Sequence, residues 1–166
     1  SYLKNFHFFD SRPIELKKNI LKGPDEGNKI RWEIADIVFD EGAMLALEVF
    51  TTTVLIVRLN SAIPSFVIER EGLFEKMFHK IKHEKDIDFS DKFSLIGDNN
   101  DEIKVFFTEN IVKFLEENEV HHIESNGDAL LIFKYLHVAR TNEIQELHTF
   151  TSNLLSCMNL KSDSEI

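Results

Sequence analysis

Between residues 120 and 136 the chain reads VHHIESNGDALLIFKYL. The dipeptide Asn126-Gly127 stands between two segments rich in apolar residues, which is the strongest short-range signal for a β-hairpin. We therefore predict strands over Val120–Glu124 and Ala129–Leu136. A type I′ turn would join them, and this turn requires positive φ at both Asn126 and Gly127.

Earlier segments show the two-residue period of strands or a short β-branched and apolar run. The run Val54–Val57 is apolar on both faces, so its strand is expected to be central and covered on both sides. The first third of the chain, including the aromatic run Phe6–Phe9, is predicted to be extended, and Asp86–Asp91 is predicted to be an acidic connection. The further predicted strands are Ile30–Phe39, Phe50–Leu59, Phe66–Ile68 and Phe93–Ile96.

The period changes to that of a helix from Leu73, with an apolar stripe that extends to Ile81. A second helix is expected after Asn99, an N-cap candidate, with a break or bend at Thr108. A last helix is expected to begin near Thr141 or Asn142. Its apolar stripe consists of Ile144, Leu147, Thr151, Leu154, Leu155 and Met158. Together these elements predict an α+β fold, a largely antiparallel sheet with about three helices packed on it.

Length and composition favour one domain. The chain has 166 residues, of which 43% are apolar, and only six Gly and three Pro. We expect residues 1–166 to form a single soluble domain, because an apolar run long enough for a membrane-spanning helix needs about 20 residues and none is present.

The formal net charge is −10, and the whole excess lies in residues 84–166. Such a chain repels nucleic-acid phosphate, and anionic membrane surfaces are disfavoured for the same reason. The acids cluster in Asp86–Asp91, Asp98–Glu102 and Glu116–Glu119. They either serve solubility or, if they share one side of the fold, attract a basic protein partner.

Two pairs of histidines are the candidates for metal ligands in the sequence. His79 and His83 are four residues apart, a spacing that places both on one helix face, but Lys76, Lys80 and Lys82 surround them and disfavour a dication. His121 and His122 are adjacent on a predicted strand and point to opposite faces, so they cannot chelate one ion. One of them is expected to pack inward.

Acidic residues and the single cysteine gave no stronger candidate. Asp86-x-Asp88-x-Ser90 copies the start of a calcium-binding loop, but Asp91 and Gly97 occupy the positions that require Gly and Glu. Glu69 and Glu71 could form a carboxylate pair for acid–base chemistry, and Cys157 is expected to be a half-buried structural thiol. No catalytic, cofactor-binding or metal-binding residue is therefore assigned.

Several short motifs in the same order over residues 30–135 carry a family resemblance. They are Ile34-x-Asp36, Thr53-Val54, Ile63-Pro64-x-Phe66-x-Ile68-x-x-Glu71, Asp86-Ile87-Asp88-Phe89, Phe93-Ser94, Gly97-Asp98, Phe107-Thr108 and Ile123-Glu124-x-x-Gly127-Asp128. With them the chain resembles uncharacterised bacterial proteins in which a short membrane-spanning helix precedes one soluble domain. Ile37 and Arg70 depart from that pattern, where a tyrosine and a proline are expected.

The resemblance implies a missing N-terminal membrane anchor and a domain on the cytoplasmic side, at the inner face of the membrane, but it implies no activity. We expect a non-enzymatic interaction or regulatory domain tethered to a membrane. The alternatives are a hydrolase-like enzyme with a scattered carboxylate site and a small acidic inhibitor or immunity-type protein. Neither a cofactor nor a nucleic-acid partner is expected.

Overall fold

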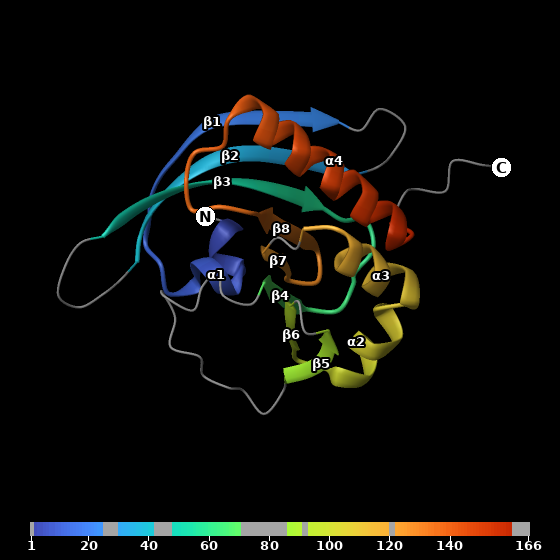
Figure 1. The fold of residues 1–166 in the computed structure, drawn as a ribbon. Helices are drawn as coiled ribbons and strands as arrows, with labels where there is room; N and C mark the ends of the chain where they lie inside the picture. Colours follow the sequence, from blue (N-terminus) through green and yellow to red (C-terminus); the bar gives the residue numbers. More distant parts are fainter. Residues whose placement is uncertain are drawn as a thin grey trace.

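The computed structural model describes residues 2–24, 30–41, 48–70, 86–90, 93–119 and 122–160, with the backbone alone at 24 and 86–90. Within these residues the chain forms one eight-stranded antiparallel sheet of order β1-β2-β3-β8-β7-β4-β6-β5 with helices packed on it (Figure 1). The predicted α+β class is confirmed. The strands are β1 (Ile14–Pro24), β2 (Arg31–Asp40), β3 (Val49–Arg58), β4 (Phe66–Arg70), β5 (Asp86–Ser90), β6 (Phe93–Gly97), β7 (His122–Ser125) and β8 (Ala129–Phe133).

The described helices are η1 (Tyr2–Asn5), α1 (His7–Asp10), α2 (Asn100–Phe106), α3 (Glu109–Glu117) and α4 (Thr141–Cys157). The last three have at least seven residues each, which agrees with the expectation of about three helices. The break at Thr108 is confirmed, because Thr108 is the N-cap of α3. Asn99 is confirmed as the N-cap of α2, since its side chain accepts hydrogen bonds from the N–H groups of Asp101 and Glu102. In the described residues no helix is both long enough and apolar enough to cross a bilayer.

The β7–β8 hairpin is confirmed, but its predicted turn type is wrong. Gly127 has φ +97°, whereas Asn126 is not among the described residues with positive φ. The Asn126 side chain instead accepts hydrogen bonds from the N–H groups of Asp128, at 3.2 Å, and Ala129, at 3.0 Å. The backbone N–H of Asn126 donates to the carbonyl of Ala129 at 3.2 Å, so Gly127 and Asp128 are the central residues of the turn, and of these two only Gly127 has positive φ.

Strand β3 is central, as predicted, and lies between β2 and β8. Its residues Val54–Val57 are buried and alternate between two hydrophobic cores. Leu55 and Val57 belong to the core beneath α2, α3 and α4, whereas Val54 and Ile56 belong to the core beneath η1 and α1. The sheet is therefore covered by helices on both faces at its centre, and we name these faces the α4 face and the α1 face.

Two expectations about local structure are wrong. Phe6–Phe9 is mostly helical rather than extended, because Phe6, Phe8 and Phe9 cover the apolar α1 face, where all three are at most 4% exposed. The acidic segment after residue 85 is not a connection: the backbone of Asp86–Ser90 pairs with β6 as strand β5. The expected helix at Leu73–Ile81 lies outside the described residues.

Candidate functional site

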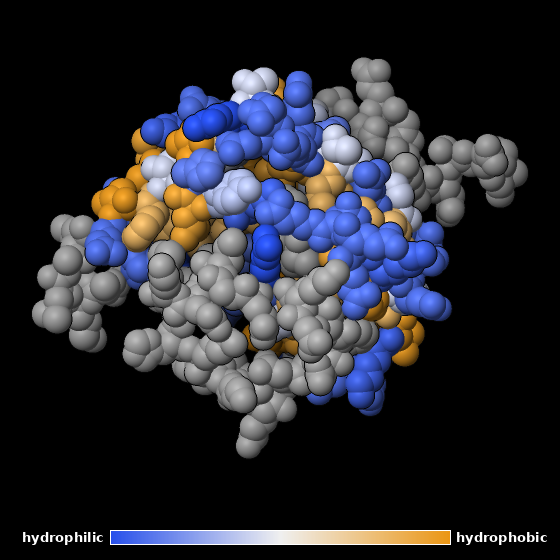
Figure 2. Space-filling view, viewed as in Figure 1, coloured by the Kyte–Doolittle hydropathy of each residue, from blue (hydrophilic) through white to orange (hydrophobic). Residues whose placement is uncertain are grey.

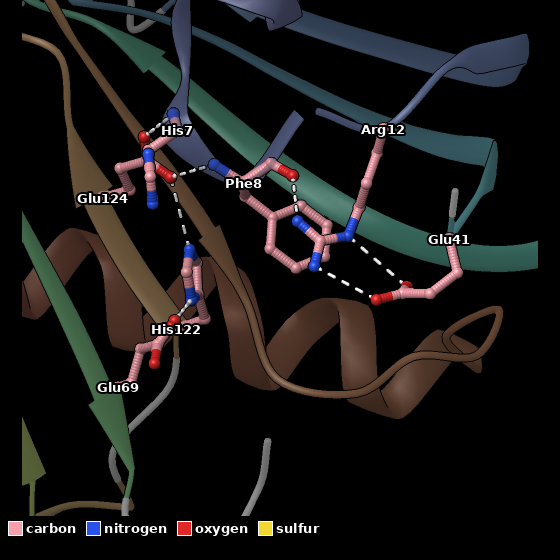
Figure 3. A network of polar contacts seen from close by, with 7 residues as sticks. All are labelled: His7, Phe8, Arg12, Glu41, Glu69, His122 and Glu124. Atoms are coloured by element: carbon pink, nitrogen blue, oxygen red, sulfur yellow. Dashed lines mark hydrogen bonds and ion pairs between the residues drawn. The ribbon is translucent and has the colours of Figure 1, made fainter. Parts of the chain in front are cut away.

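A cluster of charged side chains lies on the α1 face, where β7 and β4 meet the N-terminal helix (Figure 3). On β7, His122 and Glu124 point toward this face, while Ile123 belongs to the core on the opposite face. The neighbouring strand β4 supplies Glu69. The expectation that one of the adjacent histidines packs inward is confirmed for His122, which is 1% exposed; His121 lies outside the described residues.

Glu124 fixes helix α1 on the sheet. Its carboxylate is 2% exposed and accepts hydrogen bonds from the backbone N–H groups of His7 and Phe8, the latter at 3.0 Å. These N–H groups belong to the first turn of α1, where backbone donors have no partner within the helix and a negative charge is favourable. The carboxylate therefore satisfies donors that would otherwise be buried without a partner.

His122 bridges the two carboxylates. Its Nε2 lies 3.5 Å from Oε2 of Glu124, and its Nδ1 lies 3.5 Å from Oε1 of Glu69. The ring also stacks on Phe133, with centroids 4.6 Å apart, and meets the edge of Phe8 at 5.3 Å. With a carboxylate at each nitrogen and aromatic rings around it, the imidazole is enclosed by the protein's own groups.

The electrostatics of this cluster favour a charged histidine. Burial alone lowers the pKa of His122, but the contacts with Glu124 and Glu69 outweigh burial and raise it. Burial alone raises the pKa of Glu69, but the contact with His122 outweighs that effect and lowers it. Below its raised pKa, His122 is an imidazolium between two carboxylates, and His122 and Glu69 each stabilise the charged form of the other.

A second ion pair fastens the end of α1. Arg12 is 7% exposed, and its guanidinium donates to the backbone oxygen of Phe8 at 2.6 Å. The same group pairs with Glu41, with Nη2 to Oε1 at 3.1 Å and Nε to Oε2 at 3.4 Å. It also lies over the Phe8 ring, 4.5 Å from the centroid. Residues 7–12 are consequently held by buried charges at both ends.

Chemically, the cluster contains one carboxylate that solvent can reach. The Glu69 side chain is 33% exposed, whereas the side chains of His122 and Glu124 are almost fully buried. Among the described residues, no group of three or more His, Cys, Asp or Glu side chains could hold a metal ion. What the geometry does directly is to connect the N-terminal segment to the middle of the sheet.

Another buried carboxylate, Asp36 on β2, connects three strands. It accepts hydrogen bonds from the hydroxyl of Thr53, at 2.5 Å, and from the side-chain amide of Asn19, at 2.7 Å. Thr53 in turn accepts from the N–H of Ala139, just before α4. A hollow of about 20 Å³ beside Thr53 and Leu147 has room for water.

Many of the residues singled out in the sequence lie outside the part of the chain that the structure describes. Glu69 belongs to the cluster, while Glu71, His79, His83 and Asp91 lie outside the described residues. The side chains of Asp86, Asp88 and Ser90 lie outside them as well. Cys157 has intermediate exposure, as predicted, and lies against the core beneath α4.

The acidic cluster Glu116–Glu119 is partly neutralised within the fold. Glu119 pairs with Arg70 at 3.0 Å and also with Lys134, and Glu117 lies 3.8 Å from Lys113. These contacts reduce the number of acids on this segment that are available to an outside partner.

Glu124, Arg12 and Glu41 were not found as site residues from the sequence. The alternation His122-Ile123-Glu124 does place the two charged residues on one face of a strand, which was the available signal. Glu124 lies 117 positions from His7, and Arg12 lies 29 positions from Glu41, so no local pattern identifies these contacts.

Comparison with known proteins defines the fold but no family. No family model matches the chain, and no curated protein matches it. Among solved structures, the crystal structure of the mycobacterial trehalose monomycolate transport factor A, TtfA, superposes with a TM-score of 0.56 at 13% identity, covering 90% of this chain and 76% of that chain. The two proteins share an overall fold.

Proposed function

We propose that the chain is a non-enzymatic interaction or regulatory domain that acts while tethered to a membrane. One observation carries the proposal: the buried charges are used to fasten the N-terminal segment to the sheet. Glu124 and Arg12 hold residues 7–12, and Leu3, Phe6 and Phe9 bury their side chains on the same face. A force or constraint on residue 2 would therefore pass directly into the sheet.

Two further points support this function. The family resemblance in the sequence implies a membrane anchor before the N-terminal segment, and on this proposal the fastened segment is the connection to the bilayer. The fold also occurs in the mycobacterial trehalose monomycolate transport factor A. On this proposal the domain lies on the cytoplasmic side and presents a surface to a protein partner.

The acidic helices α2 and α3 are the proposed partner surface. On α2, Val105 is 81% exposed and stands among Asp101 and Glu102. An exposed apolar side chain surrounded by acids suits a basic protein with an apolar contact point. The alternative that this acidic surface belongs to an inhibitor or immunity-type protein predicts one tight basic target instead of a regulatory partner.

The test uses the full-length protein in its native host. A photo-crosslinking residue at Val105 is expected to capture a defined partner from the membrane fraction, whereas one at Asn153, an exposed position on α4, is not. Recovery of the protein in the soluble fraction would contradict the proposal that the protein is tethered to a membrane. Capture at both positions alike would overturn the partner surface.

An enzyme is the second candidate, because Glu69 is a partly exposed carboxylate beside a charged histidine. It predicts a hydrolytic activity that Glu69→Gln abolishes without a change in fold. The proposed function predicts that membrane retention and crosslinking are unchanged in this variant.

A further inference from the structure

Residues 2–12 can open without disturbing the sheet. They form η1 and α1, which belong to no strand, and β1 begins only after Pro13. Backbone hydrogen bonds of this segment are local, since the N–H groups of Phe6 and Phe9 donate to the backbone oxygens of Leu3 and Phe6. Opening at Pro13 therefore leaves the strand pairings of the described sheet in place.

Two kinds of contact hold this segment on the sheet. One is polar: the Glu124 carboxylate that accepts from the start of α1 also lies beside the His122 imidazole (Figure 3). The other does not depend on pH, and it contrasts with the mainly hydrophilic outer surface over α3 and α4 (Figure 2). It is the burial of four apolar side chains, each at most 4% exposed: Leu3, Phe6, Phe8 and Phe9.

Only the doubly protonated form of His122 matches the two carboxylates beside it. Nε2 lies 3.5 Å from Oε2 of Glu124, and Nδ1 lies 3.5 Å from Oε1 of Glu69. A neutral imidazole carries one N–H and one lone pair, so one of these carboxylates would face a lone pair. Loss of the proton also leaves the cluster with one more net negative charge in a buried place, which is unfavourable.

The other groups around this cluster come from three parts of the chain. On α1 the exposed His7, and after this helix Arg12, add positive charge near Glu69. Arg12 is itself paired with Glu41, and β8 contributes the uncharged Phe133 ring. His7 is thus a second imidazole at the site, and the experiment below separates it from His122.

We propose that His122 is a proton-dependent switch for the attachment of residues 2–12: the imidazolium holds the segment on the sheet, and loss of its proton makes the segment open more often. In the open state water reaches Glu124 and His122, so the buried negative charge is hydrated. The four apolar side chains keep the closed state the major one, so the proton controls the frequency of opening. The inference rests on the proposed function for its consequence, because residues 2–12 are there the connection to the membrane, and it adds how that connection is regulated.

The direction of the effect follows from proton linkage. Burial lowers the pKa of His122, but Glu124 and Glu69 raise it by more, so the closed state binds the proton more tightly than an exposed histidine with the ordinary value of 6.5. The opening constant is therefore lowest below pH 6.5. It is expected to rise by up to about tenfold per pH unit above 6.5 and to become constant above the closed-state pKa.

Hydrogen exchange of the 166-residue chain from pH 5.5 to 9 measures this opening. Rates are expressed as protection factors, so that the intrinsic pH dependence of exchange is divided out. Protection in β3, at Val54–Val57, is expected to exceed that of the segment at every pH, as local opening requires. The N–H groups expected to lose protection together above pH 6.5 are those of Phe6, His7, Phe8 and Phe9. An NMR titration of the His122 ring gives its pKa, and the loss of protection is expected to end at that value.

Two variants assign the effect to one imidazole. His122→Gln cannot take up the proton, so its segment is expected to open at the higher frequency at every pH, and the decline of protection with pH disappears. His7→Gln is the matched control, in which the decline is expected to persist. If His122→Gln does not fold, the unmodified chain decides, because a decline that ends away from the measured pKa of His122 overturns the proposal.

Three other results also overturn it. The first is segment protection that does not change with pH above 6.5 in the unmodified chain. The second is a decline that is lost in His7→Gln and retained in His122→Gln. The third is equal protection of the segment and of β3, since the opening would then be global unfolding. None of these measurements involves a membrane, so the fractionation experiment tests the proposed function separately.

Discussion

Glu124→Gln is the sharpest test of the buried cluster. The substitution keeps the size of the side chain and removes its charge. Glu124 accepts two backbone N–H bonds from α1 and faces the His122 imidazolium. A glutamine can accept with its oxygen, but its NH₂ group must face either a second N–H group or the imidazolium. One charge-assisted bond is lost and a buried cation loses one of its two carboxylates.

The expected cost follows from these losses. A hydrogen bond to a charged group contributes about 1.5–3 kcal/mol, and an unsatisfied buried donor costs about 1–3 kcal/mol. Because the glutamine retains one bond, we expect the free energy of unfolding to fall by about 3 kcal/mol. For a chain of this length that corresponds to a melting temperature lower by roughly 6–12 °C.

Urea unfolding at pH 6 measures the free energy of unfolding, and amide hydrogen exchange shows which backbone N–H groups lose protection. Exchange at His7 and Phe8 is expected to accelerate more than exchange in β2 and β3. The matched control is Glu119→Gln, a carboxylate with 45% side-chain exposure, where surface ion pairs predict a loss below about 1 kcal/mol. A loss below about 0.5 kcal/mol for Glu124→Gln, or unchanged exchange at His7 and Phe8, would refute the role assigned to Glu124.

Four further outcomes are expected. Because the pKa of His122 is raised in the folded state, its contribution to stability is complete below pH 6.5 and is lost as the pH rises through the folded-state pKa. Because the pKa of Glu69 is lowered, its contribution is complete above pH 4.5 and is lost as the pH falls through the folded-state pKa. Unfolding free energies from pH 3 to 9 are therefore expected to decline at both ends, with the alkaline decline smaller in His122→Gln and the acidic one smaller in Glu69→Gln. Gly127→Val is expected to cost about 1 kcal/mol or more, because φ is +97° while the nearest atom to a new Cβ is 3.7 Å away; an unchanged melting temperature would contradict this. Gly97→Ala places a Cβ 1.8 Å from Cδ1 of the buried Ile103 side chain, so this side chain must repack and the melting temperature is expected to fall. EDTA is expected to leave the melting temperature unchanged, and a decrease that zinc or calcium reverses would show a missed metal site.

The strands that could be predicted are those whose pattern is set by burial. Val54–Val57 is apolar on both faces because both faces are covered, and the hairpin at Asn126-Gly127 follows from local turn chemistry. The turn type was wrong because Asn126 pairs with Ala129, which makes Gly127 and Asp128 the central residues instead of Asn126 and Gly127. The dipeptide alone does not decide which two residues of the segment are central.

Elements decided by tertiary contacts could not be predicted. Helix α1 has four residues, too few to show a helical period, and it forms where Phe8 and Phe9 meet the apolar sheet face. Strand β5 alternates Asp86-Ile87-Asp88-Phe89, but its acids favoured a loop. Within the candidate site, the alternation of His122 and Glu124 was readable, whereas the contact of Glu124 with His7 was not, because 117 positions separate them.

The pairing of β3 with β8 has a consequence for how the chain folds. Leu55 lies opposite Ile132, and β8 joins β7, which pairs with β4. During synthesis, β1–β3 emerges long before its neighbour, so the apolar edge of β3 must wait for the β7–β8 hairpin. Contacts so distant in sequence slow folding and leave unpaired strands open to aggregation. We expect insertion of this hairpin to be a late, rate-determining step, and a chaperone that shields β3 to raise the yield of folded protein.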